Sequence, residues 1–244
     1  MIKKIARVMF KEMSEVLLDY SEIALDDIAS NEAIRELPII KTIVSFWKGT
    51  LSIRELYFSK KMAVFIQEMK KGNISELAFA ERLAAIEHNE EWLYKEVERI
   101  VVAIDRLDRE NKAKICAQLY VAYLKQYIKQ RDFDDLLSIT ERWFESDTEQ
   151  LLSIFQEVEW GRNKHEMEAP YIGYLTWFDP VRCGRLVGLG LLSTHLQIVS
   201  RNSQIEYKIT HHGVILSEIL KHGYVYTDHY KSEREATKKE QNKQ

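Results

Sequence analysis

Turn-forming residues are scarce in this chain of 244 residues, which contains only 9 Gly and 3 Pro. Because glycine and proline punctuate protein chains, their scarcity favours long helices joined by few turns. Only two cysteines, Cys116 and Cys183, are present. Each lies in an apolar helical pattern, so we expect reduced core residues in a cytosolic protein, with no disulfide and no cysteine-based metal site.

Long apolar runs and an excess of positive charge are also lacking. The most apolar stretch, Leu37 to Trp47, contains Lys41 and is shorter than the roughly 20 residues that cross a bilayer. Acidic residues enter the first helical pattern from Glu12 onwards, which is not typical of a signal peptide. We therefore expect a cytoplasmic protein. The formal net charge is −3, so nucleic acid would need a local basic patch.

Helical apolar spacing fills most of the first 160 residues. Hydrophobic residues make up 45% of the chain and charged residues 30%, which is enough for a core beneath a solvated surface. Apolar residues recur three and four positions apart in segments that cover residues 2–30, 60–70, 74–88, 89–107 and 108–128 and that begin again at 132 and 147. Short polar joints between such helices indicate antiparallel neighbours. The sequence therefore predicts a helical bundle domain over residues 1–160.

The polarity and the apolar spacing of the sequence change after Trp160. Residues 161–170, GRNKHEMEAP, are polar and without an apolar period, so they are predicted to be a linker. A short helix then follows Asp179 and continues as PVRCGRLVGLGLL, because proline is favoured in a first helical turn. After this helix, strand-like alternation is found on both sides of a polar turn at residues 200–203.

Two phrases in this region resemble winged-helix units. The passage RLVGLGLL matches the leucine-rich end of a winged-helix helix, and YKITHHG matches the "Y-x-[IL]-T-x-x-G" step from the wing into a closing helix. In this interpretation the strands are Leu191 to Val199 and Ile205 to Ile209, and Thr210 caps a helix that Gly223 ends. We expect a winged-helix-like domain over residues 171–230, followed by a disordered tail at 231–244 that has no apolar face.

The expected fold class is therefore mainly α, a helical bundle followed by a small winged-helix-like α+β unit. Winged helices bind DNA, RNA, peptides or their own dimer mates, so the fold alone does not fix a function.

A basic segment with aromatic residues lies inside the predicted bundle. Between Lys41 and Gly72 we count seven Lys or Arg against two acids. Its cations either pair with acids elsewhere in the bundle, or anchor a protein partner together with the aromatic residues, or contact an anionic membrane surface through residues 38–60. The candidate partner-binding residues are Lys41, Trp47, Lys48, Arg54, Tyr57, Phe58, Lys60 and Lys61.

Duplex DNA is the alternative partner. Arg182 and Arg185 lie on the short helix before the predicted hairpin, and Arg201 and Asn202 lie at its tip. Such residues contact phosphates and guanine in DNA grooves. Residues 171–230, however, contain five Lys or Arg and four acidic residues, whereas a stand-alone DNA-binding unit is generally more basic. Dimerisation would double the patch.

Catalytic and metal-binding patterns are weak. The C-terminal histidines lack the three or four converging ligands of a metal site and are interpreted as cap or surface residues: His195, His211, His212, His222 and His229. The glutamates of the region 87–98 are interpreted as a solvated helix face: Glu87, Glu90, Glu91, Glu96 and Glu98. We predict no catalytic residue, metal, cofactor or small-molecule substrate.

Two passages together resemble the abortive-infection alpha family of bacterial and phage proteins. These are LPIIKTIVSFWKGTLSIRELYFSKKMAVFIQEMKKGNISELAFAERL and VAIDRLDRENKAKICAQLYVAYLKQYIKQRDFDDLLSI, and the resemblance covers about residues 35–220. The residues that match the family's motifs are Pro38, Lys61, Phe65, Asp108, Lys112 and Ala113. The resemblance implies an accessory protein linked to phage infection or antiphage defence, and it carries over no catalytic residue.

We therefore expect a non-enzymatic interaction protein that acts through a protein partner, self-association or nucleic-acid contact. The alternative is a winged-helix transcriptional regulator that binds DNA.

Overall fold

The chain forms helices almost throughout the part that the structure describes. The computed structural model describes residues 2–11, 24, 27, 31–36, 38–45, 52–72, 76–165, 180–199 and 202–225. Most of these residues are helical, and two strands pair as one small antiparallel sheet, which confirms the mainly α class expected from the sequence. The chain divides into two compact units, Met1–Phe133 and Asp134–Gln244.

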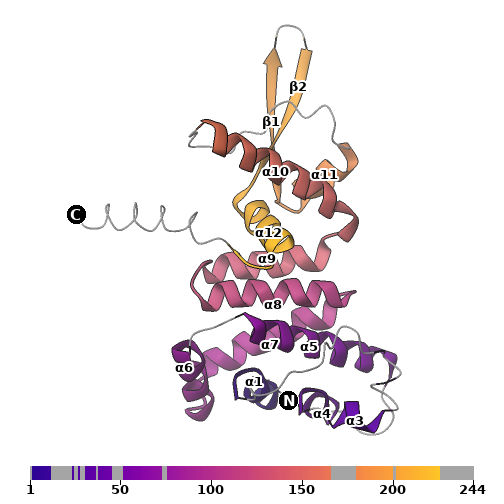
Figure 1. Cartoon of the computed structure of the whole chain (residues 1–244), viewed down its shortest axis with the longest axis vertical. Helices are drawn as coiled ribbons and strands as arrows, with labels where there is room; N and C mark the ends of the chain where they lie inside the picture. The colour runs from indigo at the N-terminus through magenta and orange to yellow at the C-terminus, as the bar shows by residue number, and fades with distance from the viewer. Residues whose placement is uncertain are drawn as a thin grey trace, which may run out of the picture. The chain divides into compact units, whose positions relative to one another are not determined.

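Helices alone make up the described part of the first unit. They are α1 (Ile2–Lys11), α3 (Glu32–Arg35), α4 (Pro38–Val44), α5 (Ile53–Lys71), α6 (Glu76–Glu87), α7 (Glu91–Arg106) and α8 (Glu110–Leu124). Helix α5 packs against α4, α7 and α8, while α1 packs against α4, α6 and α7 (Figure 1). The apolar residues that recur at helical spacing therefore meet in one helical core. Helix α9 (Gln130–Arg142) leads into the second unit.

Helix α5 has sharply defined ends. The Ser52 hydroxyl accepts a hydrogen bond from the Glu55 backbone N–H at 3.3 Å, and the Glu55 carboxylate accepts one from the Ser52 N–H at 2.6 Å, which completes a capping box. Gly72 is the C-cap of the helix, and a Cβ there would lie 2.5 Å from Cγ2 and 2.7 Å from Cγ1 of Val121 on α8, so the close packing against α8 leaves no room for a side chain at this position. A single helix from Ile53 thus replaces the separate helix that was expected to begin at Lys60.

Large apolar side chains of α5, α7 and α8 fill the core of the first unit. Phe65, Leu93 and Leu119 are fully buried, as are their neighbours along the same stripes. Burying a side chain of this kind stabilises a fold by roughly 1.5–3 kcal/mol. Packing along the predicted stripes therefore holds these helices together, since isolated helices of this length are marginal in water.

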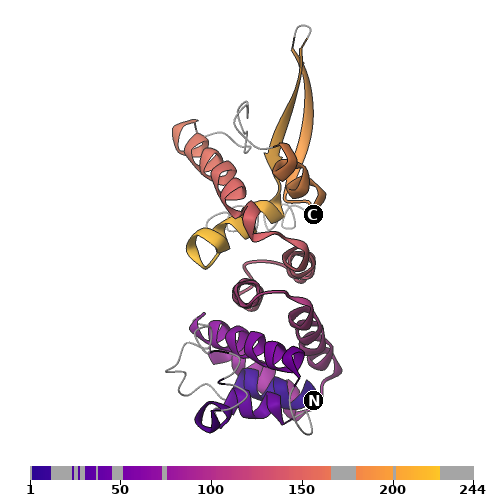
Figure 2. The same cartoon turned by 90° about the vertical axis from the view of Figure 1, so that its right-hand side faces the viewer.

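The second unit contains the sheet. Beyond α9 its elements are the 3-10 turn η1 (Glu145–Asp147), α10 (Thr148–His165), α11 (Pro180–Gly188), β1 (Leu192–Val199), β2 (Asn202–Ile209) and α12 (His211–His222). Helix α10 packs against α11 and α12, and α11 packs against β1. The strands pair in register from Leu192 with Ile209 to Val199 with Asn202. The hairpin projects beyond the helices of its own unit (Figure 1 and Figure 2).

Thr210 and Gly213 join the hairpin to α12. The Thr210 hydroxyl donates to the carbonyl oxygen of Gly190 at 2.6 Å and accepts from the Gly213 N–H at 3.1 Å. The Thr210 N–H donates to the Leu191 carbonyl at 3.0 Å. A Cβ at Gly213 would overlap that carbonyl and lie 2.7 Å from Cγ1 of Ile209. The phrase "T-x-x-G" therefore has a local structural reason: the cap and the close approach need these two residue types.

The domain boundaries differ from those expected. The two units divide at residue 133/134 and not near 160, because η1 and α10 pack with α11 and α12 of the second unit. Helix α10 continues through His165, so half of the expected 161–170 linker is helical. Polar residues can extend a helix because the hydrogen bonds that form it are made by main-chain groups. Ala24 is not helical, so residues 2–30 are not one helix. Residues 166–179 and the expected tail lie outside the described residues.

Candidate functional site

Three described cations of the basic segment, Arg54, Lys60 and Lys61, have partners within the first unit. Arg54 binds the Asp105 carboxylate at 2.5 Å, and Lys60 lies 3.2 Å from the Glu110 carboxylate. Lys61 donates to main-chain carbonyls at the end of α7, at 2.9 Å from Asp105 O and 2.5 Å from Leu107 O. An ammonium group at a helix C-terminus satisfies unpaired carbonyls and opposes the helix dipole. The segment's charge excess is therefore offset by the corner between α7 and α8.

The aromatic residues of that segment do not share one surface. Phe58 is buried, with 5% of its surface exposed, whereas Tyr57 is 40% exposed. Lys41 is exposed and pairs with Glu36. Trp47 and Lys48 lie outside the described residues. Pairing with acids elsewhere in the unit, one of the three interpretations of this segment, accounts for Arg54 and Lys60, whereas Lys61 binds main-chain carbonyls.

Residues that carry the family resemblance form part of the same corner. Lys112 is buried and lies 2.8 Å from the Asp108 carboxylate one helical turn earlier. Although burial acts in the opposite direction, the hydrogen bond and positive charge of Lys112 lower the pKa of Asp108. Burial of Lys61 lowers the pKa of its ammonium group, against the attraction of nearby acids. These motif residues have structural roles in joining α7 to α8.

Arg185, proposed from the sequence to contact DNA, is held inside the second unit. Its Nε donates to Asp147 Oδ2 at 2.8 Å, and a second guanidinium N–H donates to the other oxygen of that buried carboxylate. The guanidinium also lies 5.5 Å from the ring centre of Phe144. Bidentate pairing of this kind fixes an arginine in place. Among the other DNA candidates, Arg182 is half-buried, Arg201 lies outside the described residues, and Asn202 begins β2.

The exposed positions of α11 offer little to a DNA groove. Val181 is 66% exposed, and Gly184 and Gly188 are exposed on the same helix. Valine and glycine offer no side-chain hydrogen-bond donor or acceptor for a base edge. Of the polar candidates on α11, Arg185 is engaged by Asp147.

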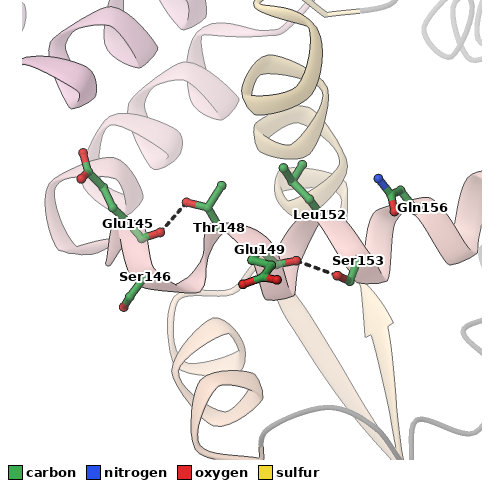
Figure 3. A pocket seen from close by; sticks show the side chains of 7 residues that line it. All are labelled: Glu145, Ser146, Thr148, Glu149, Leu152, Ser153 and Gln156. Carbon is green, nitrogen blue, oxygen red and sulfur yellow. Dashed lines mark hydrogen bonds between the residues drawn. The ribbon is translucent and has the colours of Figure 1, made fainter.

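A pocket of about 600 Å³ lies along η1 and α10 in the second unit (Figure 3). Two of its three hydroxyl groups are already used: Thr148 donates to the Glu145 carbonyl at 2.6 Å and Ser153 to the Glu149 carbonyl at 2.8 Å. The lining comes from one continuous stretch of chain, residues 145–156, and Leu152 is its one apolar side chain. This concavity therefore has little of the apolar wall that is typical of ligand sites.

A second pocket, in the first unit, has a different composition. Its volume is about 690 Å³, and it lies between α6, the start of α7 and the end of α8. We call it the Arg82 pocket. Its lining residues are Leu77, Ala78, Glu81, Arg82, Trp92, Tyr123, Leu124, Lys125, Gln126 and Tyr127. Binding sites typically combine apolar walls with a few placed polar groups, and this lining has that composition.

Two rings of the Arg82 pocket, the exposed Trp92 and the half-buried Tyr127, each lie beside a cation of the same pocket. The guanidinium of Arg82 is 5.8 Å from the ring centre of Trp92, and the ammonium of Lys125 is 5.9 Å from that of Tyr127. Trp92 is 45% exposed although tryptophan is usually well buried. Cation–π pairs of this kind contribute roughly 0.5–1 kcal/mol at exposed sites. They hold the rings and the charges together at the pocket.

A buried carboxylate lies behind Arg82. Glu96 on α7 accepts hydrogen bonds from the hydroxyls of Tyr120 and, at 3.4 Å, Tyr123. Its Oε1 is 3.6 Å from Arg82 Nε, close enough for an ion pair but beyond hydrogen-bonding distance. Burial, together with the neighbouring charge of Glu96, raises the pKa of Tyr120, so this phenol remains protonated and donates. The network fixes α6, α7 and α8 around the pocket.

The rim of the pocket is built by the end of α8. Gln126 has a positive φ of 60°, a conformation that is costly for residues other than glycine. The Gln126 N–H donates to the Tyr123 carbonyl and the Tyr127 N–H to the Ala122 carbonyl, which is the Schellman arrangement of a helix C-terminus. This turn brings Lys125 and Tyr127 to the pocket edge.

The candidate site residues predicted from the sequence do not include Arg82, Trp92 or Glu96. Glu96 was interpreted as part of a solvated face, whereas only 7% of its surface is exposed. The signal was present in the spacing: Glu96 lies three residues after Leu93 and four before Ile100, inside the apolar stripe of α7. The exposed position of Trp92 was not visible, because aromatic residues at helical spacing normally belong to the core.

Metal-binding and membrane-spanning features are not found in the described part of the chain. No group of three or more His, Cys, Asp or Glu side chains there is placed to hold a metal ion. The rings of His211 and His212 lie 5.8 Å apart at the start of α12, and His212 is 3.8 Å from the Asp135 carboxylate. Among the described helices, none combines the length and the apolar character needed to cross a bilayer.

Comparison of the chain with models of protein families, with curated proteins and with solved structures gave no match.

Proposed function

We propose that the chain is a non-enzymatic interaction protein and that it binds a partner protein at the Arg82 pocket. One observation carries the proposal: a concave site on the first unit combines an exposed Trp92 with Arg82, Tyr123 and Tyr127. Tryptophan, tyrosine and arginine are the residues most enriched among those that dominate binding energy at protein interfaces. A concave pocket with such residues accepts a side chain or chain end of a partner.

The link to phage infection or antiphage defence, and a cytoplasmic location, belong to the same proposal. The first rests on the resemblance of the two sequence passages to the abortive-infection alpha family, and the second on the sequence expectation of no signal peptide and no membrane-crossing stretch. The matching residues Lys61, Asp108 and Lys112 support the helix corner and lie outside the pocket lining. The resemblance therefore supports a shared scaffold, and the pocket supplies the surface through which this chain would act.

Quantitative affinity purification from the native host tests this function. Trp92→Ala and Lys125→Glu alter the pocket, while Val102→Ala removes a side chain of similar exposure (43%) on the same helix, outside the pocket. We expect the same proteins to be lost with both pocket variants and retained with Val102→Ala. Light scattering of the pure chain identifies the case in which the partner is a second copy. Equal recovery of every protein by all variants would contradict the proposal.

A DNA-binding regulator is the second candidate. It is favoured by the order of α11, the β1–β2 hairpin and α12, with Thr210 and Gly213 at the junction. It is weakened by the pairing of Arg185 with Asp147. A mobility-shift assay on DNA upstream of the gene, at about 50 mM salt, discriminates it, because non-specific phosphate contacts are strongest at low salt. Absence of a shift would remove this candidate.

A further inference from the structure

We infer that the Arg82 pocket binds a carboxylate group carried on an aromatic or aliphatic stem. This inference rests on the proposed function and names the chemical group of the partner that enters the site. The Nε of Arg82 is buried and has no hydrogen-bond acceptor among the described residues. A buried donor of a charged group that lacks a hydrogen bond destabilises the protein. An acceptor that reaches this donor from the pocket recovers much of that free energy.

Internal groups satisfy Arg82 only in part. Glu96 is the paired carboxylate, but its two oxygens accept hydrogen bonds from Tyr120 and Tyr123 and Oε1 lies 3.6 Å from Arg82 Nε. The internal pair therefore supplies charge compensation without a hydrogen bond at that nitrogen. A guanidinium group matches the two oxygens of a carboxylate, which makes a carboxylate the natural external acceptor.

The charges of the site disfavour a doubly charged anion. The pocket lining holds two cations, Arg82 and Lys125, and one acid, Glu81. With Glu96 behind Arg82, the four formal charges sum to zero, so a doubly charged phosphate would face two carboxylates. A cationic ligand is disfavoured as well, because the rings of Trp92 and Tyr127 already lie beside the pocket's own cations.

The walls of the pocket define the stem of the ligand. Trp92 and Leu77 are 45% and 70% exposed, and both line the site. Covering such apolar surface removes it from water and so favours binding. A carboxylate directly attached to an apolar group places its charge at Arg82 and its stem on these two side chains. The C-terminal residue of a partner chain and a free aromatic acid share this chemistry.

An NMR titration of the full chain tests the inference. The probes are N-acetylphenylalanine and N-acetylphenylalanine amide, which differ only in the carboxylate. The indole N–H signal of Trp92 is identified among the five tryptophans with Trp92→Phe. We expect the acid to shift this signal saturably and the amide to bind at least about ten-fold more weakly, because it lacks the charge-assisted pair with Arg82. Equal binding of both probes, or no binding of the acid, would overturn the inference.

Three variants locate the carboxylate. Arg82→Gln should abolish binding of the acid, with folding checked by circular dichroism. Lys125→Gln leaves the Arg82–Glu96 pair intact and should weaken binding several-fold, whereas Arg54→Gln removes an exposed cation outside the pocket and should leave it unchanged. If binding of the acid is insensitive to both pocket variants, the assignment is overturned. If Arg82→Gln does not fold, insensitivity to Lys125→Gln overturns it.

Two peptide arms separate the sources of the carboxylate. Acetyl-Ala-Ala-Phe with a free C-terminus represents a chain end, and acetyl-Ala-Glu-Phe-amide represents an acidic side chain. Tighter binding of the first peptide than of N-acetylphenylalanine indicates a partner's C-terminus, and the reverse order indicates a free acid. If partner recovery depends on Trp92 but no carboxylate probe binds, this inference fails and the proposed function stands. If the probes bind but no protein depends on the pocket, the proposed function fails alone.

Discussion

Three charged side chains lie inside apolar stripes, and each has a buried structural role. Lys61 caps α7, Lys112 pairs with Asp108, and Glu96 supports the Arg82 pocket. Their spacing relative to neighbouring apolar residues can be read from the sequence, and so can the Asp108–Lys112 pair, whose members are four residues apart. The partners of Lys61 and Glu96 come from other helices or from the corner between α7 and α8, and such long-range pairing leaves no mark on local periodicity.

Glu96→Ala should destabilise the first unit by about 3 kcal/mol, because removing one member of a buried charge pair leaves the other uncompensated. It also removes the acceptor of the Tyr120 hydroxyl. Glu98→Ala changes an exposed glutamate of the same helix and should alter the unfolding free energy by less than about 0.5 kcal/mol. Urea unfolding measures both values. Similar midpoints for the two variants would show that the Glu96 network adds no stability.

Cys116 should be unreactive in the folded protein. Burial raises the pKa of its thiol to about 12, and the thiolate is the form that reacts. At pH 8 only about one thiol in ten thousand would be ionised, and Cys183 is also fully buried. Mass spectrometry after iodoacetamide treatment should therefore show little modification of the native chain and two labelled cysteines in urea. Rapid labelling of Cys116 without urea would mean that α8 is not packed as described.

At the scale of elements, helix types were predictable and helix joints were less so. The helix capped at Thr210 and ended by Gly223 agrees with the sequence analysis, and so does the presence of a hairpin before it. The second strand, however, begins at Asn202 and not at Ile205, so two residues of the expected turn at 200–203 belong to β2. The start of α5 at Ile53 was missed, although Ser52 and Glu55 have the spacing of a capping box. The segment before Ser52 is rich in β-branched residues, so its apolar spacing did not mark where the helix begins.

Gly213→Ala should destabilise the second unit by about 3 kcal/mol or prevent its folding. The added methyl would overlap the Leu191 carbonyl and lie 2.7 Å from Ile209 Cγ1, and main-chain atoms cannot move aside cheaply. Gly184→Ala is the matched control, because no atom lies within 4 Å of its Cβ position on α11 and alanine is the better helix former. It should stabilise by roughly 0.5–1 kcal/mol. Thermal unfolding that ranks the two variants in the opposite order would refute this packing.

The corner between α7 and α8 should make the first unit sensitive to acid. Burial alone would raise the pKa values of Asp108 and Glu110, but the hydrogen bond from Lys112 in the first case, and that from the Glu110 backbone together with Lys60 in the second, lower them. A lowered carboxyl pKa contributes stability that is present above the unfolded value, about 4, and is lost as pH falls through the folded value.

Urea midpoints recorded from pH 7 to pH 3 check this dependence. The wild-type midpoint should fall below about pH 4 as the two carboxylates become protonated. Asp108→Asn removes one of the titrating groups and should lower the midpoint at pH 7 while flattening the fall in acid. An Asp108→Asn variant with the wild-type pH profile would rule out the Lys112 pair as its cause.

At the scale of the whole molecule, the mainly α class could be predicted and the division into units could not. The stripe of α10 was visible, but its apolar residues face α12 of the second unit, where Lys221 lies over the ring of Phe155. A stripe shows that a helix packs, and does not show against which neighbour. Likewise the pocket draws on α6, α7 and the end of α8, so no single sequence segment contained it.

Photo-crosslinking is the most direct test of the central claim, that the Arg82 pocket is the partner-binding site. A photoreactive amino acid in place of Leu77 lies at the pocket, and one in place of Val102 lies on α7 outside it. Illumination in the native host should give a defined adduct from position 77, weaker or no adduct from position 102, and loss of the adduct when Trp92→Ala is added. Absence of any adduct from position 77, or an adduct that persists with Trp92→Ala, would contradict the claim.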